Sequence, residues 1–124
     1  MANIQQITPV IHVPDFTAAM DFLTRVLGFR VVFQMSSYAY LEWEGAALRL
    51  LEAHHGVGAS HQEARMTVYL DVADVDAMYG SLRERLATLP VGDVKGPVDQ
   101  PWGQRELWVR MPDGHWMAFG QAIP

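Results

Sequence analysis

The segment PWGQRELWVRMPDGHW, residues 101–116, concentrates side chains that are able to bind an organic ligand. It carries Trp102, Trp108 and Trp116 together with two arginines, one glutamate and a Pro-Asp-Gly turn. Aromatic faces beside a few charged groups are typical of sites for flat organic molecules. Tryptophan and arginine are also common in partly buried structure and at dimer interfaces. The residue types alone therefore leave a ligand site, a core and an interface all open.

The sequence offers less for catalysis. It contains no cysteine, which excludes disulfides, thiolate metal sites and a cysteine nucleophile. It shows neither a glycine-rich phosphate loop nor the signature of a nucleophile elbow. A histidine and a carboxylate that meet in space, such as His12 and Glu106, would allow metal-free acid–base chemistry. We assign no catalytic residue and favour a protein that is not an enzyme.

Composition and charge narrow the range of partners. The formal net charge is −5 at pH 7, whereas nucleic acids and anionic membranes are bound by clustered lysines and arginines. No apolar run is long enough to span a bilayer, and the N-terminal residues lack the pattern of a targeting peptide. We expect a cytoplasmic protein that binds neither nucleic acid nor membrane.

An internal repeat supplies the elements that position these side chains. The segment TPVIHVPDFTAAMDFLTRVL, from Thr8, matches TVYLDVADVDAMYGSLRERL, from Thr67. In each copy a strand-like run precedes an aspartate, Asp15 or Asp74, that suits a helix N-cap. Apolar residues at helical spacing then predict two surface helices, with the stripes Phe16, Ala19, Met20, Leu23, Leu27 and Val75, Met78, Tyr79, Leu82, Leu86.

Strand candidates separated by turn signals follow each helix. The pattern is therefore βαβββ written twice, which predicts an α+β fold. Because two modules this small cannot each bury a core well, we expect one domain over residues 1–124. Its modules span residues 1–53 and 66–122 and are joined by an exposed loop, 54–65. The strand candidates are FRVVFQM, YAYLEWE and ALRLLEA in the first module, and VGDVKGPV, RELWVRM and HWMAFGQ in the second.

The chain resembles the vicinal oxygen chelate superfamily, which includes glyoxalase I, extradiol dioxygenases and bleomycin-resistance proteins. PVIHVPDFTAAMDFLTRVLGF, VADVDA and PWGQRELWVRMPDG carry the resemblance, which covers nearly the whole chain. The spacing of PWGQRE and MPDG is its most specific part, and the bleomycin-resistance branch is the most similar. The resemblance implies paired βαβββ modules whose sheets curl into a cup, in a homodimer.

The resemblance also identifies four positions at which metal-dependent members carry ligands. Here these positions hold Thr8, Arg49, Thr67 and Ala118. None is a histidine or a carboxylate, which hard divalent ions require, and an arginine facing the cup would repel a cation. His54, His55 and His61 lie in the joining loop, where spacing fixes nothing. We predict no metal and no cofactor.

Strand alternation, anchored on the cup position of Ala118, predicts which side chains face the cup. Leu107, Val109, Met117 and Phe119 then face the helices, and Ala118 and Gly120 leave room for a ligand. The phase of the strand at 38–44 stays undetermined, and His115 is expected to point away. The predicted ligand-binding residues are His12, Arg49, Tyr69, Trp102, Glu106, Trp108, Arg110 and Trp116.

The function predicted from these features is non-enzymatic binding and sequestration of a small aromatic or drug-like molecule in clefts of a homodimer, as the bleomycin-resistance branch implies. The alternative is a glyoxalase-like lyase or dioxygenase. It would use metal ligands at positions not recognised above, or His12 and Glu106 without a metal. A third possibility is a structural or regulatory dimer whose cup binds nothing of consequence.

Overall fold

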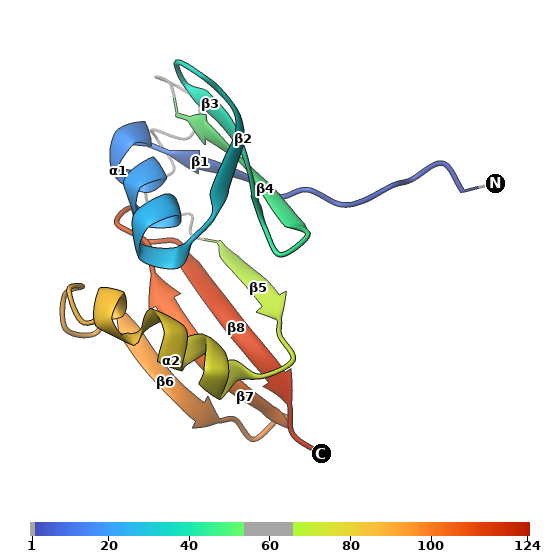
Figure 1. Cartoon of the computed structure of the whole chain (residues 1–124), viewed down its shortest axis with the longest axis vertical. Coiled ribbons are helices and arrows are strands. Elements are labelled where there is room, and N and C mark those ends of the chain that lie inside the picture. Colours follow the sequence, from blue (N-terminus) through green and yellow to red (C-terminus); the bar gives the residue numbers. More distant parts are fainter. Residues whose placement is uncertain (1, 54–65) are drawn as a thin grey trace.

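A computed structural model describes residues 2–53 and 66–124 and confirms two βαβββ modules, one above the other in Figure 1. The joining loop, with His54, His55 and His61, lies outside the described residues. The first module contains β1 (Val10–Val13), α1 (Phe16–Asp21), η1 (Phe22–Leu27), β2 (Arg30–Met35), β3 (Tyr38–Trp43) and β4 (Ala46–Glu52). The second contains β5 (Thr67–Asp71), α2 (Val75–Leu86), β6 (Val94–Asp99), β7 (Gln104–Arg110) and β8 (Trp116–Ala122).

Each module forms its own four-stranded mixed sheet. The strand orders are β1-β4-β3-β2 and β5-β8-β7-β6, so the first strand of each module pairs in parallel with the last. The remaining pairs are antiparallel. Because the two orders correspond strand by strand, equivalent positions of the repeat occupy equivalent places in the two sheets.

Aspartate caps begin both helices, as the sequence predicts. Asp15 Oδ1 accepts a hydrogen bond from the amide of Ala18, and Asp74 Oδ1 accepts one from Ala77, each at 3.0 Å. These bonds satisfy amides that have no partner inside a helix. The first helix ends in the π-helical turn η1, which the apolar spacing did not predict, and Gly28 closes it with a φ of +116°.

The helix-covered faces of both sheets share one hydrophobic core. Leu107, Val109, Met117 and Phe119 are fully buried there, as strand alternation predicts. The Trp43 ring links the modules, since its centroid lies 5.9 Å from that of Phe119. Ala39 and Leu41 are buried in the same cluster, with Trp43 packed against it, which settles the phase of β3.

His115 provides a polar connection between the modules. Its Nδ1 accepts a hydrogen bond from the amide of Met66, 3.0 Å away. Its Nε2 lies 3.1 Å from the carbonyl oxygen of His12 in the first module. One imidazole therefore bridges the beginnings of β5 and β8 to β1.

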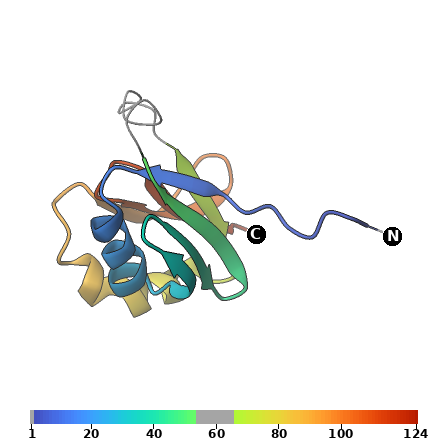
Figure 2. The ribbon, with the colours of Figure 1, turned by 90° about the horizontal axis from the view of Figure 1, so that it is seen from above.

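Two apolar regions of the first module are exposed. The N-terminal arm, residues 2–9, extends away from the body in Figures 1 and 2, with Ile4 and Ile7 more than four-fifths exposed. The edge strand β2 is exposed along its whole length and includes Phe33 and Met35. Among the described residues, no helix has the length and apolarity needed to cross a membrane.

Candidate functional site

The face of the second sheet that is turned away from the helices brings six of the predicted site residues together. Its strands place their side chains in register: Tyr69 of β5 is opposite Ala118 of β8, which is opposite Trp108 of β7. One row along, Gly120 is opposite Glu106. We call this surface the aromatic face; it comprises Tyr69, Lys95, Trp102, Glu106, Trp108, Arg110 and Trp116.

A buried carboxylate organises the rings of the aromatic face. Glu106 is only 1% exposed and is the one buried charged residue among those described. Its Oε2 accepts hydrogen bonds from the Tyr69 hydroxyl at 2.7 Å and from Trp102 Nε1 at 3.1 Å. Its Oε1 accepts one from Trp108 Nε1 at 2.8 Å. Three aromatic side chains from β5, β7 and the loop before β7 thus converge on one anion.

These hydrogen bonds keep Glu106 ionised. Burial alone raises the pKa of a carboxyl group because it disfavours the charged form. The bonds from Trp108, Tyr69 and Trp102, with a contribution from Gln100, outweigh burial and leave the pKa of Glu106 below its ordinary value. Burial and the bond to Glu106 raise the pKa of Tyr69 to about 12, so the phenol stays protonated and remains a donor.

The other end of the aromatic face combines rings with positive charge. The rings of Trp108 and Trp116 meet edge to face, with centroids 6.1 Å apart. Lys95 Nζ lies 5.1 Å from the centre of the Trp116 ring, within the range of a cation–π contact. Arg110, opposite Trp116 in the register, is paired with Asp93 at 3.9 Å. Lys95 is not among the residues predicted from the sequence.

The prediction that Gly120 leaves room for a ligand is wrong. A Cβ at this position would lie 1.8 Å from the Tyr69 hydroxyl oxygen. The space above the glycine is therefore filled by the Tyr69 ring, which crosses it to reach Glu106. Ala118, between Tyr69 and Trp108 in the register, is also fully buried. The small residues accommodate the protein's own aromatic rings.

His12 and Arg49 lie on the other sheet, and the structure does not place them on the aromatic face. Arg49 of β4 is opposite Tyr40 of β3, so the open face of β3 carries Tyr38 and Tyr40. Neither tyrosine was among the residues predicted from the sequence, because the phase of β3 was undetermined. The pairing of Tyr40 with Arg49 is the signal that would have identified them.

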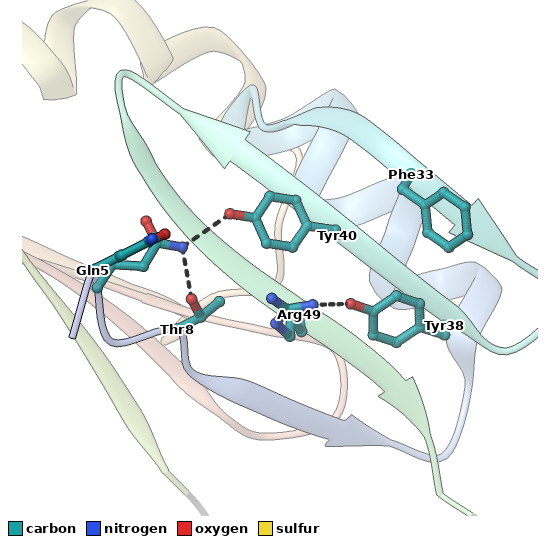
Figure 3. Close-up of a pocket in the computed structure, with 7 residues that line it drawn as sticks. Gln5, Thr8, Phe33, Tyr38, Tyr40 and Arg49 are labelled. Carbon is teal, nitrogen blue, oxygen red and sulfur yellow. Dashed lines mark hydrogen bonds between the residues drawn. The ribbon is translucent and has the colours of Figure 1, made fainter. Parts of the chain in front are cut away.

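Two recesses in the described part of the chain lie next to predicted site residues. One, of about 820 Å³, lies over the open face of the first sheet and includes Thr8, Tyr40 and Arg49 (Figure 3). The other, of about 790 Å³, lies between the modules and is lined by Trp43 and by residues of β5 and α2. None of the three tryptophans of the aromatic face lines either recess, whereas Tyr69 lines the second one.

The positions that would carry metal ligands do not fit a divalent ion. Thr8 and Arg49 line the recess of the first sheet, where the guanidinium contributes a positive charge. Thr67 and Ala118 lie on the second sheet, and Ala118 offers no donor atom. No group of three histidine or carboxylate side chains is arranged to hold a metal among residues 2–53 and 66–124.

The structure also separates the two side chains considered for metal-free catalysis. The carboxylate of Glu106 is bonded to Tyr69, Trp102 and Trp108. His12 is exposed on β1 of the other sheet, and no hydrogen bond or ion pair connects it with Glu106 within the described ranges. A direct proton transfer between them does not follow from this geometry.

The two βαβββ modules, each with strand order 1-4-3-2, define a class of fold. A family comparison matches residues 3–119 to the Glyoxalase/Bleomycin resistance protein/Dioxygenase superfamily. The chain belongs to this superfamily, as the sequence resemblance predicted. No curated protein sequence matches it.

Solved structures with this fold include both binding proteins and an enzyme. The bleomycin-binding protein of bleomycin-producing Streptomyces verticillus, in complex with copper(II)-bleomycin, is 23% identical, with a TM-score of 0.74 over 96% of this chain and 97% of that one. A bleomycin resistance determinant encoded on transposon Tn5 is 21% identical, with a TM-score of 0.73 over 96% and 98%. Lactoylglutathione lyase from Agrobacterium tumefaciens is 16% identical, with a TM-score of 0.70 over 96% and 95%. At these identities the likeness is one of fold.

Proposed function

We propose that the protein binds a flat aromatic or drug-like molecule on the aromatic face and sequesters it without chemical change. The proposal includes a cytoplasmic homodimer, as in the bleomycin-resistance branch that the sequence resembles. Its support is the geometry of the aromatic face, together with the bleomycin-binding proteins among the structures that share the fold.

The observation that carries the proposal is the convergence of three aromatic side chains on the buried carboxylate of Glu106. Trp102 is 63% exposed and Tyr69 is 39% exposed, yet each has its polar atom fixed by a hydrogen bond. Rings held in place before a ligand arrives lose little conformational freedom on binding, which favours affinity. Glu106 acts in this account by positioning the rings from beneath.

The distribution of charge supports a ligand with a polar substituent beside its flat part. Lys95 and Arg110 flank Trp116 at one end of the aromatic face. A planar group can stack on the indoles while a hydrogen-bond acceptor on the same molecule reaches these cations. We assign Trp102, Trp108 and Trp116 to stacking, and Arg110 to the polar contact.

The exposed apolar surface of the first module supports the homodimer. Val32, Phe33 and Met35 of the edge strand β2 are 47%, 52% and 61% exposed. An exposed apolar edge strand favours association, and a second copy of the chain would cover it. Ile4 and Ile7 of the N-terminal arm add apolar surface that a single chain leaves in solvent.

Isothermal titration calorimetry with bleomycin and mitomycin C tests the binding proposal. We expect saturable binding of at least one of them to the wild type. Trp102→Ala is expected to weaken that binding by about tenfold, since loss of one stacking aromatic side chain typically costs about 1–3 kcal/mol.

Trp102→Phe is the matched control because it keeps a ring but removes the indole N–H that bonds to Glu106. It should retain more affinity than the alanine variant. Absence of binding to either compound, or equal affinity of the wild type and Trp102→Ala, would argue against the aromatic face as the site.

A further inference from the structure

Arg49 is half-buried beside aromatic rings and has no acidic partner among the described residues. Its Nη1 donates a hydrogen bond to the Tyr38 hydroxyl, and its guanidinium carbon lies 4.7 Å from the centre of the Tyr40 ring. None of the ion pairs in the described part of the chain involves it. A guanidinium has five N–H donors, so most of its capacity is unused here.

The hydroxyl groups around Arg49 can donate hydrogen bonds to an incoming acceptor. Tyr38 accepts its hydrogen bond from Arg49, and Tyr40 accepts one at 3.0 Å from Gln6 Nε2. The Thr8 hydroxyl accepts another at 2.8 Å from the same amide nitrogen. Because each oxygen acts as an acceptor in these bonds, its own O–H is free to donate. Figure 3 shows Tyr38, Tyr40, Thr8 and Arg49 on one face of the sheet.

The recess around these donors has the size and charge for an anionic ligand. Its volume is about 820 Å³, in the range of small-molecule sites. Its lining contains one arginine and no carboxylate, in a chain whose net charge is −5. Removing part of a guanidinium's charge from water costs free energy, and an anion bound beside Arg49 would offset that cost.

We propose that this recess binds a carboxylate carried on an aromatic ring, with Arg49 as its main contact. A planar carboxylate matches the fork of the guanidinium, which can donate two parallel hydrogen bonds to its oxygens. Tyr40 and Tyr38 supply ring faces beside it. The site lies on the first sheet and uses none of the residues of the aromatic face, so it stands or falls separately from the proposed function.

Calorimetric titration with naphthalene-2-carboxylate and its neutral amide, 2-naphthamide, tests this site. The two probes share the same rings and differ in charge. The wild type is expected to bind the carboxylate about tenfold more tightly than the amide, because hydrogen bonds to charged groups are stronger than neutral ones. Arg49→Met should remove this preference, and Arg49→Lys should keep part of it.

Arg30→Met is the matched control, because Arg30 is an arginine of the same sheet that is paired with Glu42 and does not line the recess. It should leave the ratio of the two affinities unchanged. Circular dichroism and urea unfolding establish that each variant is folded. Equal affinity of the wild type for both probes, no saturable binding of the carboxylate at millimolar concentration, or a preference that survives Arg49→Met would each overturn the proposal. A wild type without carboxylate preference, whose dimer dissociates on Arg49→Met, would instead assign Arg49 to an acidic group of a second copy.

Discussion

Replacing Glu106 with glutamine changes one atom at the centre of the aromatic face. The carboxylate accepts hydrogen bonds from three donors, whereas the amide offers a single acceptor oxygen and an NH₂ group. The Tyr69 hydroxyl can turn toward Gln104 Oε1, 3.2 Å away, and accept from the amide. An indole N–H can donate a hydrogen bond but cannot accept one. Only one of Trp102 and Trp108 can therefore keep the side-chain oxygen of residue 106 as its acceptor.

The magnitude of the loss follows from these bonds. Trp102 is 63% exposed, so water can replace its acceptor, while the half-buried Trp108 retains the amide oxygen. Hydrogen bonds to a charged group contribute about 1.5–3 kcal/mol, compared with about 0.5–1.5 kcal/mol for neutral ones. The free energy of unfolding should therefore fall by about 1–3 kcal/mol at pH 7.

The stability lost in Glu106→Gln should decrease as the pH falls. The pKa of Glu106 is lowered on folding, so its stabilising contribution is complete above the ordinary glutamate pKa, about 4.3. That contribution fades as the pH falls through the folded-state pKa. Protonated glutamate presents the same kinds of donor and acceptor as glutamine, and the difference between wild type and Glu106→Gln should shrink toward pH 3.

Urea unfolding of both proteins between pH 3 and 7 measures this difference. The contributions of the other carboxylates are shared by the two proteins and cancel when the free energies of unfolding are subtracted. Glu42→Gln is the control, because Glu42 forms an exposed ion pair with Arg30 at 2.6 Å. Exposed pairs contribute about 0–1 kcal/mol, so that variant should change little. A difference for Glu106→Gln that stays constant or grows as the pH falls would refute the positioning role of the carboxylate.

Three further predictions concern packing, capping and assembly. Gly120→Ala places a Cβ 1.8 Å from the Tyr69 hydroxyl oxygen and should cost about 1–3 kcal/mol in urea unfolding, but less in a Tyr69→Ala background; equal costs would contradict the account of the glycine. Asp74→Ala removes the cap of α2 and should lower the free energy of unfolding by about 0.5–2 kcal/mol, whereas Asp74→Asn should keep most of the stability. Equal losses for the two variants in thermal unfolding would contradict this role of Asp74. Sedimentation equilibrium should show a wild-type dimer that Phe33→Glu weakens, and a monomeric wild type would rule the dimer out.

Much of the fold could be predicted from local patterns. Asp15 and Asp74 each stand before an apolar stripe, and a cap followed by helical periodicity depends only on nearby residues. Alternation along β7 and β8 placed Leu107 and Phe119 in the core and Trp108 on the opposite face. The phase of β3 was undetermined because tyrosines occupy one face and Trp43 the other.

Most residues of the aromatic face could be predicted from the sequence, but the contacts between them could not. Alternation assigns Glu106 to the open face, but it does not show that Tyr69, Trp102 and Trp108 all bond to it. Those contacts depend on the register of β5, β7 and β8 and on the path of the loop before β7. The same limit applies to Arg49, whose membership of a separate recess follows from the division into two sheets.

The indole N–H signals of the four tryptophans in a ¹⁵N-correlated NMR spectrum test the central proposal most directly. Titration with bleomycin or mitomycin C should shift Trp102, Trp108 and Trp116 with saturation. The signal of Trp43, whose ring packs between Phe29 and Phe119, should not shift and serves as the internal control. Saturable binding that shifts none of the three, or no binding of either compound, would contradict a ligand site on the aromatic face.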